Sequence, residues 1–257
     1  MEEPTPPATN EASSPRSTSL IARLMNVVVT PGEVFDEVKA SKPFYLNWLV
    51  PLLLAAVVGV VYVYVIFSQP AVLQGVRESQ QKQFQKQVAA GKMTQAQADK
   101  AGEAIEQYMT PTIMKFAGAV GAVFSNVAWL FLAALSLWLL GRFVFKGNFT
   151  CLQAVEVTGL ATMISNLGAI ISMLLVVVNG NMYVTPGPAL LIGDFDPGNK
   201  THLLLSAFNL TTLWFIAVLS LGLARLSGAS FAKSGSWLFG VWAVFKLGSI
   251  FLLGGKM

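Results

Sequence analysis

The sequence predicts an all-α, polytopic membrane protein. It has five transmembrane helices, an N-terminal amphipathic segment, and a polar helical-hairpin insert between the first two spans. Two observations support this fold class. Hydrophobic residues make up 54% of the chain and charged residues 12%, whereas a soluble domain carries roughly 25% charged residues. Five apolar stretches also reach the ~18 residues needed to cross a bilayer, and in lipid such long runs pair their backbone groups as helices.

The N-terminal region divides into two parts. Residues 1–17 are rich in Pro, Ser and Thr and are expected to form a disordered tail. Residues 18–43 carry apolar side chains at helical spacing. Thr30-Pro-Gly-Glu33 is typical of a capping box at a helix start. We expect two short amphipathic helices that lie in the headgroup plane, cap the helix bundle, or do both.

The transmembrane domain covers residues 44–257. Its expected spans are 46–67, 116–140, 152–178, 203–224 and 236–253. The expected interfacial anchors are Trp48, Arg23 and Lys42. Small residues let helices approach closely in lipid. The stripe of Gly118, Ala122, Ser125, Ala133 and Ser136 is therefore expected to face other helices, and so is the arc of Gly159, Thr162, Asn166 and Ala169.

The polar insert, residues 69–112, is expected to form an αα-hairpin that stands off the membrane. Gly91 is typical of a helix end, and Thr94 with Gln97 forms a second capping box. The positive and negative charges of the insert nearly balance, which gives no reason to expect nucleic-acid binding. The insert is either a solvated spacer or a docking surface.

Polar residues within the spans suggest one candidate site. Glu156 lies about two turns into the third span, where a carboxylate is costly unless it is paired, hydrated or protonated. The candidate set is Glu156, Gln153, Asn166, Asn209 and Lys246. In the alternative interpretation, Glu156 reaches interfacial water or Arg142, and Lys246 extends to the headgroups.

Several function classes lack support in the sequence. Cys151 is the only cysteine, which excludes an intrachain disulfide framework and a cysteine metal cluster. No serine-hydrolase, phosphate-loop, zinc-protease or dinucleotide motif is present. Asp194-Phe-Asp196-Pro-Gly198 is typical of an Asx turn. We therefore predict no catalytic residues, no metal and no cofactor, and we predict that the chain is not an enzyme.

The distribution of basic residues in short loops predicts the orientation of the chain. An inside N-terminus places most of these residues in the cytoplasm. They are Arg16, Arg23, Lys39, Lys42, Arg142, Lys146, Arg225 and Lys233. We expect a multi-pass protein of the cell membrane with a cytoplasmic N-terminus, an extracytoplasmic C-terminus and an extracytoplasmic insert.

Three segments carry a resemblance to a known family. They are Leu20-Ile-Ala-Arg-Leu through Thr30-Pro-Gly-Glu-Val-Phe35, Gly147-Asn-Phe-Thr-Cys-Leu-Gln-Ala through Gly159, and Asn209-Leu-Thr-Thr-Leu-Trp through Lys233. Their order and spacing, over residues 18–67 and 113–253, resemble bacterial Yip1-domain membrane proteins. The resemblance implies five spans, a cytoplasmic N-terminus and no established catalytic residues. The chain departs from the family pattern in its long insert and in lacking a proline near Ile164.

These observations favour a non-enzymatic scaffold or adaptor in membrane organisation or trafficking-like processes. Its expected partners are the lipid bilayer and a membrane protein or a second copy of the chain. The alternative is a transporter of ions, small molecules or lipids that uses the intramembrane polar residues. An intramembrane enzyme is the weakest hypothesis.

Overall fold

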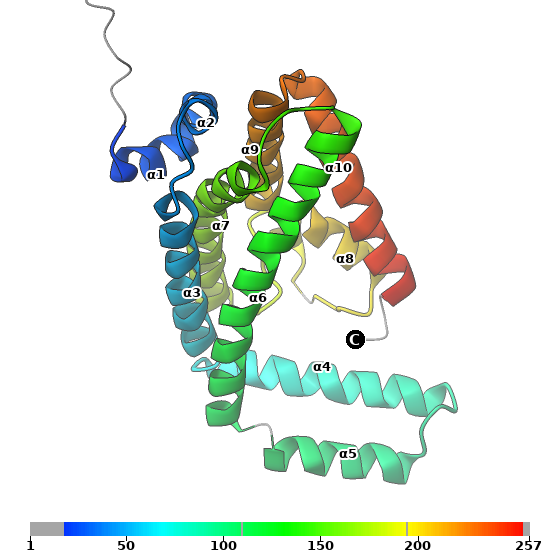
Figure 1. Ribbon diagram of the computed structural model, residues 1–257. Helices are drawn as coiled ribbons and strands as arrows, with labels where there is room; N and C mark the ends of the chain where they lie inside the picture. Colours follow the sequence, from blue (N-terminus) through cyan, green and yellow to red (C-terminus); the bar gives the residue numbers. More distant parts are fainter. Residues whose placement is uncertain (1–17, 109, 194, 254–257) are drawn as a thin grey trace, which may run out of the picture.

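The computed structural model describes residues 18–108, 110–193 and 195–253, and every regular element in these ranges is helical (Figure 1). Five helices are long and apolar enough to cross a bilayer, as the sequence predicts. These are α3 (Leu46–Ile66), α6 (Pro111–Leu139), α7 (Cys151–Asn179), α9 (Leu210–Ser227) and α10 (Phe231–Gly248). The predicted tail, residues 1–17, lies outside the described residues.

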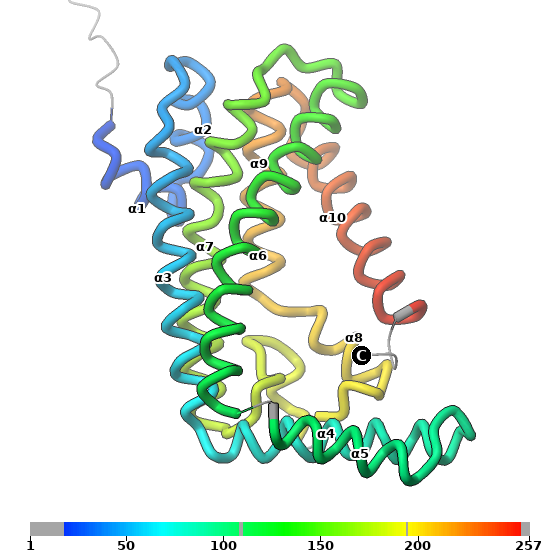
Figure 2. The backbone as a smooth tube through the Cα atoms, turned by 60° about the horizontal axis from the view of Figure 1, so that its bottom comes forward, coloured from blue at the N-terminus to red at the C-terminus, as the bar shows by residue number. Residues whose placement is uncertain are grey.

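Helix α7 is at the centre of the bundle and packs against α3, α6 and α9. Helix α10 packs on α9 and leans away from α6 (Figures 1 and 2). The backbone of α7 approaches its neighbours closely at glycines. A Cβ atom at Gly159 would overlap the Trp48 backbone on α3, and one at Gly168 would overlap Thr211 on α9. Dispersion between closely packed backbones holds helices together in lipid.

The predicted small-residue arcs are confirmed only in part, since Thr162 and Ala169 on α7 are half-buried. Gly159 and Asn166 are buried against neighbouring helices. On α6, a Cβ atom at Gly118 would lie 2.8 Å from Val63 Cγ1 on α3. Ser125 and Ser136 are exposed instead, so the α6 stripe was wrong at these positions. The contact between α6 and α3 includes fewer positions than the predicted stripe. A small residue fits a lipid-facing surface as well as a contact between helices, so residue size alone does not identify the contact.

The fourth span begins later than the expected residue 203. Lys200–Ala207 forms a separate short helix, α8, and the chain breaks before α9. Asn209 causes this break, because its Oδ1 accepts hydrogen bonds from the backbone N–H groups of Thr211 at 3.0 Å and Thr212 at 3.3 Å. An asparagine that caps a helix in this way competes with continuation of the preceding helix. Asn209 therefore lies at the end of a span.

Two short helices, α1 (Leu20–Val29) and α2 (Pro31–Ala40), lie across one end of the bundle (Figure 1). Val27, Phe35 and Val38 are buried and belong to the main hydrophobic core. The predicted capping box at Thr30 was wrong, because its side chain makes no capping bond. The Thr30 N–H bonds to the Asn26 carbonyl to close α1, and its φ of −126° and ψ of 57° differ from the extended backbone typical of an N-cap.

The insert forms the predicted hairpin, with α4 (Pro70–Ala89) and α5 (Gln95–Tyr108). Gly91 has a φ of 67° at the turn. Thr94 and Gln97 exchange both hydrogen bonds of the predicted capping box. The hairpin runs across the far end of the bundle (Figures 1 and 2). Val72 is buried with Ile66 and Val176 where α4 meets the spans.

An ion pair links α4 to the connection between α7 and α8. Lys86 Nζ lies 3.3 Å from Asp196 Oδ2, and Asp196 Oδ1 accepts a hydrogen bond from the Gly198 N–H at 2.8 Å. The second bond confirms an Asx turn at Asp196; Asp194 lies outside the described residues. The Gly198 N–H, and then the Lys86 ammonium, hold the pKa of Asp196 below its usual value.

The lowered pKa of Asp196 predicts how the hairpin attachment depends on pH. The folded state favours the ionised carboxyl, so this contribution is fully present above the ordinary aspartate pKa and is lost as the pH falls through the lowered value. We expect the protection factors of the amides in residues 181–193, corrected for the intrinsic pH dependence of amide exchange, to stay constant near neutral pH and to fall below about pH 4. Asp196→Asn should exchange faster already at neutral pH. Identical exchange in both proteins at neutral pH would contradict this attachment.

The connection between α6 and α7 is tightly constrained. It begins with the π-helical turn η1 (Leu140–Val144). Lys146 then adopts a left-handed backbone with a φ of 56°, which costs a residue other than glycine about 1–2 kcal/mol. A Cβ atom at Gly141 would overlap the Phe149 ring, and one at Gly147 would lie 2.8 Å from Ser227 Cα. Close packing on both sides therefore holds this turn in place.

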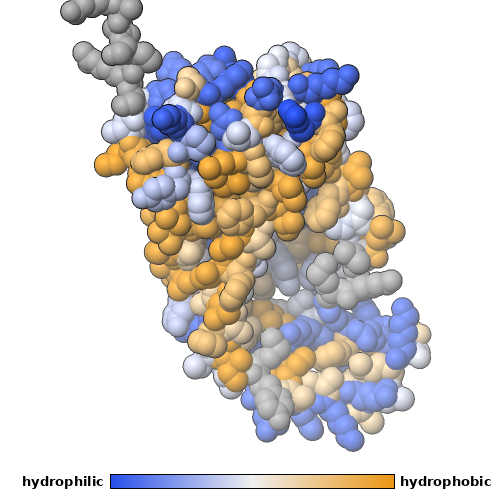
Figure 3. Space-filling view, in the orientation of Figure 1, coloured by the Kyte–Doolittle hydropathy of each residue, from blue (hydrophilic) through white to orange (hydrophobic). Residues whose placement is uncertain are grey.

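The surface shows where the bilayer boundaries lie. Hydrophobic side chains cover the middle of the molecule, and hydrophilic ones gather at both ends (Figure 3). Lysines stack over aromatic rings near both ends of the spans, as expected for interfacial anchors. The distances from Nζ to the ring centroid are 5.4 Å for Lys233 over Phe145, 6.0 Å for Lys115 over Tyr64 and 5.1 Å for Lys200 over Phe251.

Candidate functional site

Glu156 on α7 is bound to Asn47 on α3. The Asn47 Nδ2 donates a hydrogen bond of 2.7 Å to Glu156 Oε2, and both residues have zero exposed surface. Glu156 is thus enclosed by protein and reaches neither solvent nor Arg142, which bonds within its own turn. A buried carboxylate needs such partners, because its desolvation costs several kcal/mol.

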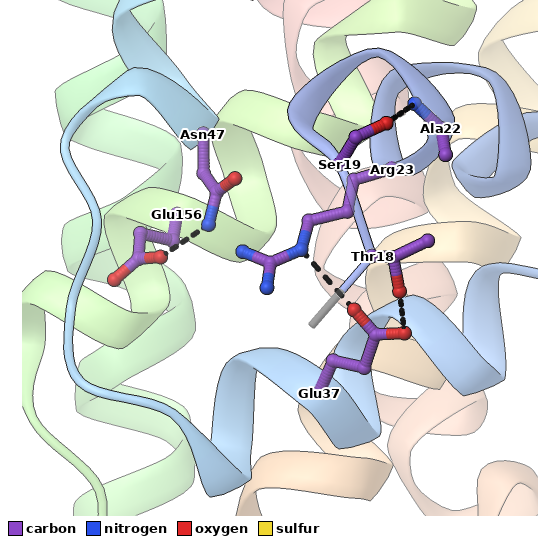
Figure 4. Close-up of polar contacts among 7 residues, drawn as sticks. All are labelled: Thr18, Ser19, Ala22, Arg23, Glu37, Asn47 and Glu156. Atoms are coloured by element: carbon purple, nitrogen blue, oxygen red, sulfur yellow. Dashed lines mark hydrogen bonds and ion pairs between the residues drawn. The ribbon is translucent and has the colours of Figure 1, made fainter. Parts of the chain in front are cut away.

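A second polar contact connects the N-terminal helices to this pair. Arg23 on α1 is buried, and its Nε donates a 3.1 Å hydrogen bond to Glu37 on α2. Glu37 also accepts a bond from the Thr18 hydroxyl. The Arg23 guanidinium lies between Glu37 and the Glu156–Asn47 pair, with its terminal nitrogens turned toward that pair (Figure 4). Polar groups from α1, α2, α3 and α7 therefore meet at one end of the bundle.

Several buried polar atoms near this junction have no hydrogen-bond partner among the described residues. These are Glu156 Oε1, Asn47 Oδ1, Trp48 Nε1 and Thr158 Oγ1. An unpaired buried polar group costs about 1–3 kcal/mol, and such groups usually bind an ordered water. The junction therefore has the chemistry to hold water or to exchange a proton. The Glu156 and Asn47 oxygens that lack partners point apart (Figure 4).

Two further predicted residues on α7 make separate helix contacts. Asn166 is buried, and its Nδ2 donates a 3.2 Å bond to the Pro51 carbonyl on α3. It lies ten residues after Glu156, or about 15 Å along the helix. Gln153 forms a capping box with Thr150 at the start of α7, and its Nε2 donates a 3.4 Å bond to the Lys39 carbonyl. These two residues hold α7 against its neighbours at two different levels along the helix.

The structure places the remaining predicted residues apart from Glu156. Asn209 caps α9. Lys246 is half-buried on α10, which packs against α9 and η3 (Ser249–Leu253). Of the three predicted anchors, Lys42 is exposed and Arg23 is buried. Trp48 turns inward and packs edge-on against Phe131, with ring centroids 5.7 Å apart. The predicted set is thus brought together only in part.

Sequence reasoning missed Asn47 as the partner of Glu156. The available signal was a lone amide in the first turn of an otherwise apolar span. Asn126 on α6 was also missed, and its Nδ2 donates a 3.2 Å bond to the Ala55 carbonyl on α3. Both amides bind α3 to a neighbour. Nothing in the local pattern identifies the partner, because that depends on how two helices rotate relative to each other.

Comparisons with known proteins identify a domain family and a membrane-protein relative. The family model described as Yip1 domain matches residues 25–253. Membrane protein YknW of Bacillus subtilis (strain 168) is 29% identical over 157 residues, which cover 58% of this chain and 65% of that protein. No solved structure matches the chain. Because the family model extends over nearly all of the described helices, this chain is an integral membrane protein that belongs to the Yip1 domain family.

Proposed function

We propose that this protein is a non-enzymatic membrane scaffold or adaptor, and that α1 and α2 form the platform that contacts a membrane-protein partner. One observation carries this proposal. The platform buries one apolar face in the bundle and exposes a second apolar edge. Ile21, Met25 and Val29 are 71%, 67% and 79% exposed. They are spaced four residues apart, so they lie along one edge of α1.

The location of this edge favours a partner at the membrane surface. Helix α1 lies beside the start of α3, where Phe44 and Tyr45 are also exposed. The platform is fixed to the bundle at several points. Arg225 Nη1 on α9 lies 3.1 Å from Asp36 Oδ2, and Lys39 Nζ donates a 2.7 Å bond to the Arg225 carbonyl. A rigidly held apolar edge at the bilayer boundary suits contact with another membrane protein.

The test is affinity purification in mild detergent, followed by mass spectrometry of the proteins and lipids that co-purify. We expect a stoichiometric membrane-protein partner with the native chain. The triple variant Ile21→Ser, Met25→Ser, Val29→Ser should insert normally and lose that partner about tenfold or more, because each large apolar side chain contributes 1.5–3 kcal/mol when buried. Deleting the whole platform is a poorer test, because it would uncover the core around Val157 and Leu223.

The matched control changes exposed apolar residues at the opposite end of the bundle. Leu190 and Leu191 are 43% and 89% exposed, and replacing both with serine should leave the partner bound. A partner that survives the α1 variant, or that the control removes equally, would rule out this edge as the contact.

The transporter alternative is favoured by the unpaired oxygens of Glu156 and Asn47. It predicts a partner-free particle with one defined lipid or small molecule. It also predicts transport in proteoliposomes that is lost in Glu156→Gln. Transport that is indifferent to Glu156→Gln would exclude this site.

A further inference from the structure

Two neighbouring loops carry cations that form no ion pair with a carboxylate among the described residues. Arg142 and Lys146 lie between α6 and α7, and Lys233 lies in the first turn of α10. The sequence contains no Asp or Glu in residues 107–155 or 197–257. Among the described residues at this end, the ion pairs are Arg23 with Glu37 and Arg225 with Asp36. The three cations therefore present a positive surface, and all three side chains are exposed.

Direct contacts hold the two loops together. Lys233 Nζ lies 5.4 Å from the centroid of the Phe145 ring, next to Lys146. Gly147 packs against Ser227, at the end of α9. Arg142 Nη1 donates 3.5 Å hydrogen bonds to the Gly147 carbonyl and the Asn148 Oδ1. The positive surface is therefore built on a packed turn, with Lys146 kept in a left-handed backbone conformation that glycine would favour.

Exposed aromatic side chains border the cations. Phe143, Phe231 and Trp237 are 70%, 51% and 45% exposed, and they belong to the ends of apolar spans. Hydrophilic side chains lie above hydrophobic ones at this end of the molecule (Figure 3). Tryptophan rings at the ends of spans lie at headgroup depth, and Trp237 marks that level here. The cations are therefore placed at the level of lipid phosphates. This depth favours a lipid over an acidic soluble protein as the group that they bind.

We infer that Arg142, Lys146 and Lys233 form a binding surface for the phosphate headgroup of an anionic phospholipid. Arginine and lysine supply charge-assisted hydrogen bonds to phosphate oxygens. The bordering aromatic rings contact the upper acyl chains. This inference is independent of the proposed scaffold role, because it involves neither the platform edge nor a protein partner.

The experiment measures lipid preference by native mass spectrometry of the full-length protein. The protein is equilibrated with equimolar phosphatidylglycerol and phosphatidylcholine, and the ratio of the bound lipids is recorded. We expect the native chain to prefer phosphatidylglycerol. The variant Arg142→Gln, Lys146→Gln, Lys233→Gln should lose this preference about tenfold or more, because each cation near an anionic surface contributes about fivefold.

Two further variants keep the test decisive. Lys115→Gln with Lys200→Gln removes two cations from the opposite end and should keep the preference. Lys146→Gly suits the left-handed backbone, so it should fold at least as well as the native chain and lose the preference about threefold to fivefold. Added inorganic phosphate should not displace the lipid. An unchanged preference in Lys146→Gly, an equal loss in the opposite-end variant, or displacement by phosphate would overturn the inference.

Discussion

Replacing Gly159 with valine is expected to lower the free energy of unfolding in mild detergent by about 3 kcal/mol or more. A Cβ atom at this position overlaps the Trp48 backbone, so the substitution forces α3 and α7 apart. The cost is high because the overlap is with the backbone of Trp48, which cannot move aside as a flexible side chain can. The separation also lengthens the Asn47–Glu156 hydrogen bond. Denaturant titration with circular dichroism measures the change.

Gly121→Val on α6 is the matched control for this substitution. Nothing lies within 4 Å of a Cβ atom at Gly121. Both changes add the same side chain to a spanning helix, so they differ only in the space available. The control should stay within about 0.5 kcal/mol of the native chain. Equal effects at the two positions would show that the close contact between α3 and α7 does not limit stability.

Replacing Asn47 with leucine is the second large effect, and we expect the free energy of unfolding to fall by about 1.5–3 kcal/mol, the range for a buried hydrogen bond to a charged group. The fully buried Glu156 Oε2 then loses its 2.7 Å hydrogen bond from Asn47 Nδ2. Glu156→Gln should cost less, since the new side-chain oxygen still accepts from Asn47 Nδ2. The double variant Asn47→Leu, Glu156→Leu should recover most of the stability, because it removes both members of the pair and leaves neither without its partner.

This pair of substitutions forms a double-mutant cycle. The coupling energy, measured in the same detergent, should be at least about 2 kcal/mol. Asn166→Leu, which removes the separate bond to the Pro51 carbonyl, should add independently to Asn47→Leu. Additive effects of Asn47→Leu and Glu156→Leu would show that the two side chains do not depend on each other, contrary to the geometry.

The sequence by itself determined the number and order of the spans, the two platform helices and the hairpin. These features are local. A helix must be long and apolar to cross hydrocarbon, and caps such as Thr94 with Gln97 need only residues three positions apart. The break before α9 is also a local feature, because Asn209 caps the helix. The sequence analysis missed it because hydropathy is averaged over a window longer than a cap, and the residues around Asn209 are apolar.

Only the tertiary structure decided which groups meet. Glu156 binds Asn47, Trp48 packs against Phe131, and Arg23 is buried on the side of α1 that faces the bundle. In a soluble protein, the polar face of a helix points to water, so the apolar face opposite it identifies the side that points inward. In lipid, both sides of a helix such as α7 are apolar, so its sequence does not reveal its rotation. Contacts between helices depend on that rotation and on the relative depth of the helices in the bilayer. Close packing at residues such as Gly159 determines both, and it exists only after the helices have assembled.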